Sequence, residues 1–241
     1  MGAESRFREF LKSLPLEGAD PQDLLGKFTA YAGLIRDWSK RFNLVSKNDL
    51  EKIWTRHFMD SLMPLSLHPD LAFDSAIDVG SGAGFPGVPV KIVRPATLLA
   101  FADSTGKKCS FIQEVLSALG LANCEVANSR AEILGQDAGY RERFDVAFTR
   151  ALAQPPAVLE LAFPFVKVGG VAIFWAAGPK WEERKKIDRI ANGLGCSFRS
   201  RKPYRLAEGD REREIVIFEK KKPTDPRYPR RTGVPEKSPL K

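Results

Sequence analysis

The sequence predicts an α/β fold: a mostly parallel seven-stranded sheet with helices on both faces, preceded by an N-terminal helical extension. Three observations support this prediction. Short apolar segments alternate with amphipathic stretches of helical length, a pattern typical of parallel sheets. The first apolar segment runs directly into a glycine-rich turn at 80–87. The last two apolar segments flank the polar turn at 208–210, which is too short to join parallel strands.

Two amphipathic helices are expected before the sheet begins. Apolar residues recur mostly every three or four positions over 24–45, which predicts the first helix. Asp20 is a candidate N-cap for it, and Pro21 is a candidate first-turn proline. The second helix is expected at about 49–62, capped by Asn48 or Asp49 and ended by Pro64.

The sheet elements then follow in order. Five parallel strands are expected at residues 76–79, 98–102, 124–127, 144–148 and 171–175, the last introduced by Gly169 and Gly170. Helices are expected between them at 105–119, 155–166 and 180–194. A closing antiparallel pair is expected at 196–206 and 213–219. The chain thus divides into a helical extension (1–70), a sheet domain (71–222) and a basic, proline-rich tail (223–241) that is expected to be extended.

Charge and composition narrow the classes of partner. The 241 residues carry a net charge of +8, and eight Lys or Arg but only two acids lie between Lys220 and Lys241. A basic tail favours a polyanionic partner, and a solvated tail without a partner is equally compatible with it. Three widely spaced cysteines and two histidines argue against a metal site or a disulfide framework. No apolar run is long enough for a membrane-spanning helix, and no secretory signal is evident.

The strongest motif is the glycine-rich turn Asp78-Val79-Gly80-Ser81-Gly82-Ala83-Gly84-Phe85, between the first strand and a helix. Doubly wound sheets bind ligands at this point, and glycines let the backbone approach the ligand closely. A dinucleotide fingerprint counted from Gly80 would need a small residue where Phe85 stands. The spacing instead resembles the first motif of Rossmann-like methyltransferases, in which an acid such as Asp78 lies near the cationic groups of S-adenosylmethionine. A tight turn without a ligand is the alternative.

A second acid, Asp103, ends the next strand about 20 residues after the glycine turn. An ionised carboxylate only accepts hydrogen bonds, which suits the two hydroxyl groups of a ribose. The alternative role for Asp103 is an N-cap of the helix that starts near Thr105.

Several further motifs resemble one family, the bacterial small-subunit ribosomal RNA guanine-N7 methyltransferases, also called glucose-inhibited division protein B. The resemblance covers about Tyr31 to Lys241, and the motifs occur in family order. They are Arg56-His57-Phe58-Met59-Asp60-Ser61-Leu62, the glycine turn continued to Pro89, Asp103-Ser104 with Lys107-Lys108, Ser129-Arg130-Ala131-Glu132, Phe144-Asp145 leading to Thr149-Arg150-Ala151, Gly169-Gly170, and Tyr228-Pro229-Arg230-Arg231-x-Gly233-x-Pro235. Together they are far more specific than a lone glycine turn.

This resemblance implies a cytoplasmic class I methyltransferase, with 71–222 as its catalytic domain, that uses S-adenosylmethionine to methylate N7 of one guanine in 16S rRNA. The implied partner is 16S rRNA or the small ribosomal subunit, with no metal and no membrane, and a monomer is expected. The expected cofactor contacts are Asp78, Gly80, Gly82, Gly84, Phe85, Asp103, Ser104, Thr105, Ala131, Glu132 and Arg150.

The expected chemistry is an in-line methyl transfer that needs no general base, because guanine N7 has a free lone pair. The protein then contributes positioning and exclusion of water. Arg150 is the candidate catalytic residue, which would orient the guanine through its O6. The candidate RNA-binding residues, each of which could also be an ordinary surface charge, are Lys107, Arg130, Lys180, Arg213, Arg230 and Arg231.

Two aromatic side chains near these motifs have alternative roles. Phe85 could stack on an RNA base or only cover the adenosine. His57 could be catalytic, but its place on an amphipathic helix beside Arg56 and Asp60 favours a structural role.

Other functions remain compatible with the fold. These are a methyltransferase with another RNA target or atom, a non-catalytic RNA-binding protein, and a nicotinamide-dependent oxidoreductase. Phe85 argues against the oxidoreductase. The intact set of acids and glycines argues against a non-catalytic protein.

Overall fold

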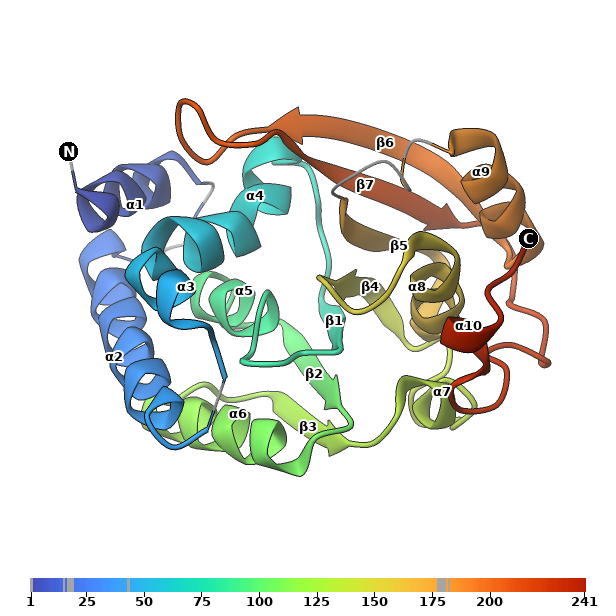
Figure 1. Cartoon of the computed structure of the whole chain (residues 1–241), viewed down its shortest axis with the longest axis horizontal. Coiled ribbons are helices and arrows are strands. Elements are labelled where there is room, and N and C mark those ends of the chain that lie inside the picture. Colours follow the sequence, from blue (N-terminus) through green and yellow to red (C-terminus); the bar gives the residue numbers. More distant parts are fainter. Residues whose placement is uncertain (1, 15, 17–19, 43, 177–180, 182) are drawn as a thin grey trace.

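The computed structural model describes the chain except residues 1, 15, 17–19, 43, 177–180 and 182, and its described part contains one seven-stranded sheet (Figure 1). The strand order is β3-β2-β1-β4-β5-β7-β6. The strands are β1 Ser75–Val79, β2 Leu98–Asp103, β3 Cys124–Asn128, β4 Phe144–Thr149, β5 Val166–Ala176, β6 Cys196–Tyr204 and β7 Arg213–Lys220. The first five are parallel, and β7 runs antiparallel between β5 and β6. The predicted mostly parallel sheet with a closing antiparallel pair is confirmed.

Helices cover both faces of this sheet (Figure 1). They are α1 Ala3–Ser13, α2 Pro21–Ser39, α3 Lys47–Glu51, α4 Asp60–Leu67, α5 Gly87–Val93, α6 Gly106–Ala118, α7 Ala131–Leu134, α8 Pro155–Ala162, α9 Arg184–Gly193 and α10 Val234–Lys237, with a π-helix, η1, at Ile53–Met59 and a 3-10 turn, η2, at Phe163–Phe165.

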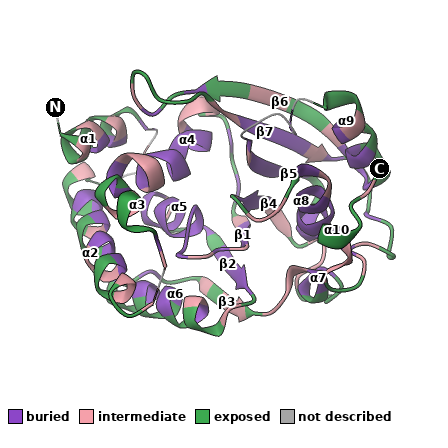
Figure 2. Ribbon diagram, in the orientation of Figure 1, coloured by how far each residue is buried: buried purple, intermediate pink, exposed green. Residues whose placement is uncertain are grey.

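Alternate strand residues divide the core between the two faces. Phe101 and Phe148 pack into a cluster with α1, α2 and the other helices up to α6, whereas Ala100 and Ala147 pack into a second cluster with α8 and α9. Figure 2 shows the resulting pattern, with buried central strands and exposed outer helix surfaces.

The helical extension differs from the prediction in three places. Helix α1 was not predicted, α2 ends at Ser39 and does not reach 45, and the second predicted helix has other bounds. Asp20 caps α2 by accepting a hydrogen bond from the Gln22 amide at 2.9 Å, as predicted. The next helical region starts earlier than expected, and Ser46 caps it. Pro64 does not end it, because α4 continues to Leu67.

The structure explains why Pro64 is tolerated there. A proline has no N–H to bond the carbonyl four residues earlier, which here is the carbonyl of Asp60. The Trp175 indole Nε1–H donates to that carbonyl at 2.8 Å instead. The acceptor left free by the proline is therefore satisfied by a residue on β5.

Strand β5 also begins earlier than predicted, so Gly169 and Gly170 lie inside it rather than before it. The register of β4 and β5 shifts between Phe144 and Val146. A Cβ on Gly170 would lie 2.5 Å from the Asp145 carbonyl oxygen, so only glycine allows this close approach of the two strands.

The expectation of an extended tail was wrong. Residues after Lys222 pack against α7 and α8 and form α10 (Figure 1). The Arg230 guanidinium makes a bidentate ion pair with Glu160 of α8, and Glu160 is 0% exposed. The sequence signals of proline and positive charge did not reveal this partner, because it lies 70 residues away along the chain.

Candidate active site

The glycine turn after β1 is held in its shape by backbone conformation and by three neighbours. Gly80, Gly82 and Gly84 have φ angles of +77°, +59° and +89°, the left-handed region that favours glycine. The amide of Gly80 donates to the carbonyl of Ala102 at the end of β2. The amide of Gly82 donates to Asp103 Oδ2 at 2.9 Å. On the other side, the Tyr31 hydroxyl of α2 donates to the carbonyl of Ala83.

Two cavities flank this turn at the carboxyl ends of β1, β2, β3 and β4. The first, here named the Asp103 cavity, has a volume of about 220 Å³. The second, named the Phe85 cavity, has a volume of about 300 Å³. Gly80, Lys108 and Ala151 line both, so the two cavities adjoin across the glycine turn.

Most of the expected cofactor contacts lie on these cavities. The Asp103 cavity contains Gly80, Asp103, Ser104, Thr105, Ala131 and Glu132. The Phe85 cavity contains Gly80, Gly82, Phe85 and Arg150. A Cβ on Gly82 would meet no atom nearer than 3.9 Å, so its missing side chain leaves open space on the cavity side. Residues from four separate motifs are thus brought together as the sequence predicted.

Asp103 has the role at the helix start that was considered for it, and it also holds the glycine turn. Its side chain is largely buried, with 8% of the residue exposed. Oδ1 accepts from the Thr105 amide at 2.8 Å, which secures the start of α6, and Oδ2 accepts from Gly82. Lys108 Nζ lies 3.7 Å from the same carboxylate. Since a carboxylate can accept about four hydrogen bonds, acceptor capacity remains on the side that lines the cavity.

Asp78 and Gly84 are the two expected contacts that lie on neither cavity. Asp78 is 0% exposed and its Oδ2 accepts from the Gly87 amide at 2.8 Å. Burial raises the pKa of Asp78 to about 7, and its Oδ1 has no partner among the described residues. The structure therefore places Asp78 beneath the turn, where it holds the start of α5, and we do not assign it a cofactor contact. Gly84 is enclosed by Val88 and Tyr31.

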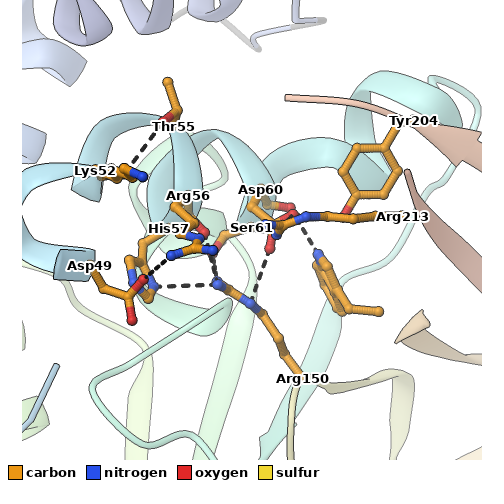
Figure 3. Close-up of polar contacts among 11 residues, drawn as sticks. Asp49, Lys52, Thr55, Arg56, His57, Asp60, Ser61, Arg150, Tyr204 and Arg213 are labelled. Atoms are coloured by element: carbon orange, nitrogen blue, oxygen red, sulfur yellow. Dashed lines mark hydrogen bonds and ion pairs between the residues drawn. The ribbon is translucent and has the colours of Figure 1, made fainter. Parts of the chain in front are cut away.

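Arg150, at the end of β4, is fixed by residues of the helical extension (Figure 3). Its Nε lies 3.1 Å from Asp60 Oδ2, Nη1 donates to the Ser61 hydroxyl at 3.2 Å, and Nη2 donates to the Arg56 carbonyl at 2.9 Å. The side chain is 14% exposed. Because most of its donors are already used, Arg150 is rigidly placed, and a guanine contact would have to use the remaining Nη1–H.

Asp60 is the centre of this polar cluster, which we name the Asp60 hub: Asp60, Arg150, Arg213 and Tyr204. Asp60 is 1% exposed, and Oδ1 accepts from Arg213 Nη1 at 3.0 Å and from the Tyr204 hydroxyl at 2.6 Å. Burial and the Asp60 carboxylate raise the pKa of Tyr204 well above its ordinary value. The hub ties β4, β6 and β7 to the start of α4 (Figure 3).

His57 lies between the hub and the glycine turn. Burial, together with the Arg150 guanidinium, lowers the pKa of His57 to about 3, so the ring is neutral. Its Nδ1 lies 3.3 Å from Arg150 Nη2 and accepts from it, which leaves the proton on Nε2. The ring packs on Phe85 with centroids 4.6 Å apart. These contacts support the structural role favoured for His57.

The candidate RNA-binding residues are in different environments. Arg213 and Arg230 make ion pairs with the buried carboxylates of Asp60 and Glu160, so their charges are used inside the fold. Arg130 is half-buried and pairs with Glu132 at 3.0 Å. We therefore do not assign Arg213 or Arg230 to an RNA interface.

Lys107 and Arg231 remain available at the surface. Both are exposed: Lys107 lies over the ring of Phe42, and Arg231 lines an open groove beside Gln136. Lys180 lies outside the described residues.

Sequence reasoning missed several residues that line the cavities. Leu152 and Leu161 line the Asp103 cavity, and Glu236 reaches it from the tail. Leu44 and Asp49 line the Phe85 cavity from the helical extension. Their positions depend on contacts between distant segments, so no local motif could have identified them. Lys108, which lines both cavities, was within a quoted motif but was not singled out.

A further cavity, lined partly by Leu152 and Glu236, does not reach the glycine turn. Its volume is about 510 Å³, and it lies between α8, α9 and α10, where it shares only Leu152 and Glu236 with the Asp103 cavity. The two cavities at the glycine turn are therefore the candidate sites for cofactor and substrate.

The described residues contain no group of three or more His, Cys, Asp or Glu side chains placed to hold a metal ion. Among the same residues, no helix is both long and apolar enough to cross a membrane.

Fold and site together define a class, the Rossmann-like methyltransferases. Solved structures agree with this at the level of the fold. The CurJ carbon methyltransferase superposes with a TM-score of 0.51, at 13% identity over 68% of this chain and 54% of that chain. M. jannaschii TYW2 in complex with AdoMet superposes with a TM-score of 0.50, at 14% identity over 67% of this chain and 76% of that chain.

Sequence comparison gives the particular family. Residues 24–195 match the family model described as rRNA small subunit methyltransferase G. The ribosomal RNA small subunit methyltransferase G of Carboxydothermus hydrogenoformans is 38% identical over 88% of this chain and 90% of the relative. The ribosomal RNA small subunit methyltransferase G of Acetivibrio thermocellus is 37% identical over 95% of this chain and 97% of the relative. The chain belongs to the rRNA small subunit methyltransferase G family.

Proposed function

We propose that this protein transfers the methyl group of S-adenosylmethionine to N7 of a guanine in 16S rRNA. The observation that carries the proposal is the pair of cavities that adjoin across the glycine turn, one lined by the Asp103 carboxylate and the other by Phe85 and Arg150. Membership of the family and the relatives' names support ribosomal RNA as the substrate.

The residues present fit this cofactor. The acceptor capacity left on Asp103 suits the ribose hydroxyls, and the apolar side chains of Leu152 and Leu161 suit the faces of an adenine. The space left by the side chain that Gly82 lacks allows a methionine chain to pass along the turn. When bound, the cofactor supplies an electrophilic methyl group on a sulfonium.

The protein's part in the reaction is to position the reactants. Guanine N7 carries a lone pair at neutral pH, so no residue has to remove a proton. Phe85 and Arg150 form a rigid wall of the second cavity, with the guanidinium 5.7 Å from the ring centroid. A fixed wall next to the glycine turn can hold a base in line with the methyl group, and such positioning lowers the barrier to the displacement.

Charge also supports an RNA substrate. The chain carries a net charge of +8, and exposed cations extend beyond the tail onto α9 and β6. They include Arg184, Lys185, Arg189, Arg199 and Lys202. Such a surface binds the phosphate backbone through release of counterions.

The active form that we propose is a cytoplasmic monomer. One chain supplies the residues of both cavities, so a second copy is not needed to complete the site.

The test is to map methylation directly. Small ribosomal subunits and free 16S rRNA that lack the modification are incubated with the protein and S-adenosylmethionine carrying an isotopic label in its methyl group. Nucleoside mass spectrometry should find labelled 7-methylguanosine, and cleavage at reduced 7-methylguanosine should locate a single site. Asp103→Asn should reduce the labelling, and the exposed-surface variant Glu212→Gln should not. Label on another atom, or none with either substrate, would overturn the proposal.

A further inference from the structure

The C-terminal tail is anchored so that one of its residues, Glu236, lines the Asp103 cavity. Arg230 donates through Nε and Nη2 to Glu160 at 2.9 and 2.7 Å, and its backbone amide donates to the same carboxylate at 2.8 Å. Three residues later, the Gly233 amide donates to Glu132 Oε1 at 2.8 Å. Because Glu160 is fully buried, this attachment is part of the core and not a loose surface contact.

A second set of contacts holds the earlier part of the tail. The Arg141 guanidinium donates to the carbonyls of Thr224 and Tyr228, both at 2.7 Å. Gln136 Nε2 donates to the carbonyl of Pro229 at 2.9 Å. The tail backbone is therefore fixed on both sides of Arg230, and so is the short helix α10 that follows it.

The consequence is that α10 places Glu236 at the edge of the Asp103 cavity. The cavity has two unlike parts. Asp103, Ser104 and Thr105 form a polar part, and Ala131, Leu152 and Leu161 form an apolar part. Glu236 comes from α10, which packs on α8, the helix that carries Leu161. A flat base with apolar faces would occupy the apolar part with its polar edge towards Glu236.

The other carboxylate in this part of the cavity is already committed. Glu132 is 4% exposed, and its Oε1 accepts from both Arg130 and the Gly233 amide. Glu236 is exposed at the cavity edge and makes no hydrogen bond or ion pair with another described residue. Its charge acts on Arg130 only from a distance: the pKa of Arg130 is raised mainly by its hydrogen bond to Glu132 and to a smaller extent by Glu236. The Glu236 carboxylate is thus available to accept a hydrogen bond from a ligand.

We propose that Glu236 accepts a hydrogen bond from the exocyclic amine of the adenine and so makes the tail a determinant of cofactor specificity. This inference rests on the proposed function, since it assumes an adenosyl cofactor in the Asp103 cavity. An amine donates to a carboxylate, whereas the carbonyl oxygen at the same position of a hypoxanthine would be repelled by it.

The test compares two nucleosides that differ at this exocyclic group and in whether the neighbouring N1 carries a hydrogen. Binding of S-adenosylhomocysteine and S-inosylhomocysteine is measured by calorimetry on the full-length wild type, Glu236→Gln, Glu236→Ala and the control Lys237→Ala. The wild type and the control should prefer the adenosyl compound by about tenfold or more, as expected for one charge-assisted hydrogen bond. Both Glu236 variants should bind the adenosyl compound more weakly, and Glu236→Gln should also bind the inosyl compound more tightly, because its amide can donate to the carbonyl.

The outcomes separate this inference from the proposed function. If the wild type binds S-adenosylhomocysteine but does not distinguish the two compounds, or if the Glu236 variants behave like Lys237→Ala, the role of Glu236 is refuted and the cofactor assignment stands. If the wild type binds neither compound, the proposed function fails with it. Circular dichroism of each variant shows that the fold is intact, which is expected because Glu236 is exposed.

Discussion

Replacement of Asp60 by asparagine should destabilise the protein and weaken cofactor binding together. The change keeps the size of the side chain but removes the charge that two arginines share. Arg150 and Arg213 would remain 14% and 25% exposed, without a counter-charge. Tyr204 would keep a neutral acceptor only if the amide turns its oxygen towards the hydroxyl.

The expected magnitude follows from this burial. Loss of one partner of a fully buried ion pair costs about 3–5 kcal/mol. Because both guanidinium groups retain some contact with water, we expect the lower end, about 3 kcal/mol. For a chain of this length, that corresponds to a fall in Tm of roughly 6–12 °C. The matched control is Glu212→Gln, whose ion pair with Arg205 is more than half exposed. Such pairs contribute about 0–1 kcal/mol.

Urea unfolding of both variants gives the free energies, and calorimetry with S-adenosylmethionine gives the Kd. The double variant Asp60→Asn/Arg213→Met should cost less than the sum of its two single changes, because the second removes a charge that the first leaves unpaired. If Asp60→Asn costs no more than Glu212→Gln and leaves the Kd unchanged, the hub neither stabilises the fold nor positions Arg150.

Three further results are expected. Burial raises the pKa of Asp78 from 3.8 to about 7, so the stability that its protonated form contributes is complete below pH 3.8 and is lost as the pH rises through 7. Asp78→Asn should remove this part of the pH dependence of the free energy of unfolding in urea. The same dependence of that free energy on pH in both proteins would contradict the assignment. Glu160→Gln should cost about 3 kcal/mol and expose the tail to limited tryptic cleavage, whereas Asp225→Asn, which alters an exposed ion pair, should leave cleavage as in the wild type. Asp103→Asn should raise the Kd for S-adenosylmethionine by about 10- to 100-fold, since a charged acceptor is lost; an unchanged Kd in calorimetry would rule out ribose binding by Asp103.

The elements that the sequence predicted well are those with local signals. The glycine turn could be predicted because three closely spaced glycines follow the first strand, and all three have positive φ in the structure. Asp103 could be predicted because it ends the next strand. Parallel strands place their carboxyl ends at one edge, so the two motifs had to meet there. The positions of β1 to β4, β7 and α6 also followed from period and length, without knowledge of tertiary contacts.

The elements that were predicted wrongly depend on partners far away in the chain. Pro64 ends a helix in an isolated peptide, but here Trp175 takes up the carbonyl that the proline leaves free. The tail reads as solvated from its prolines and charges, yet Arg230 finds Glu160 across 70 residues. Arg213 was a candidate RNA-binding residue, but its guanidinium pairs with Asp60, 153 residues away. A sequence alone does not pair such charges.

The internal ion pairs of Asp60 and Asp103 determine which side of the site keeps an excess of positive charge. In the Asp60 hub, one carboxylate serves two guanidinium groups, and the adjacent His57 is neutral, so the wall of the Phe85 cavity keeps an excess positive charge. Lys108 adds to it at the junction of the two cavities, where Asp103 is its counter-charge. This field attracts a carboxylate or an RNA phosphate and opposes a sulfonium. We therefore propose that the ribose and the adjacent sulfonium lie on the side of Asp103, that the methionine carboxylate points towards the Phe85 cavity, and that the RNA binds on the same positive side, where the methyl group is delivered.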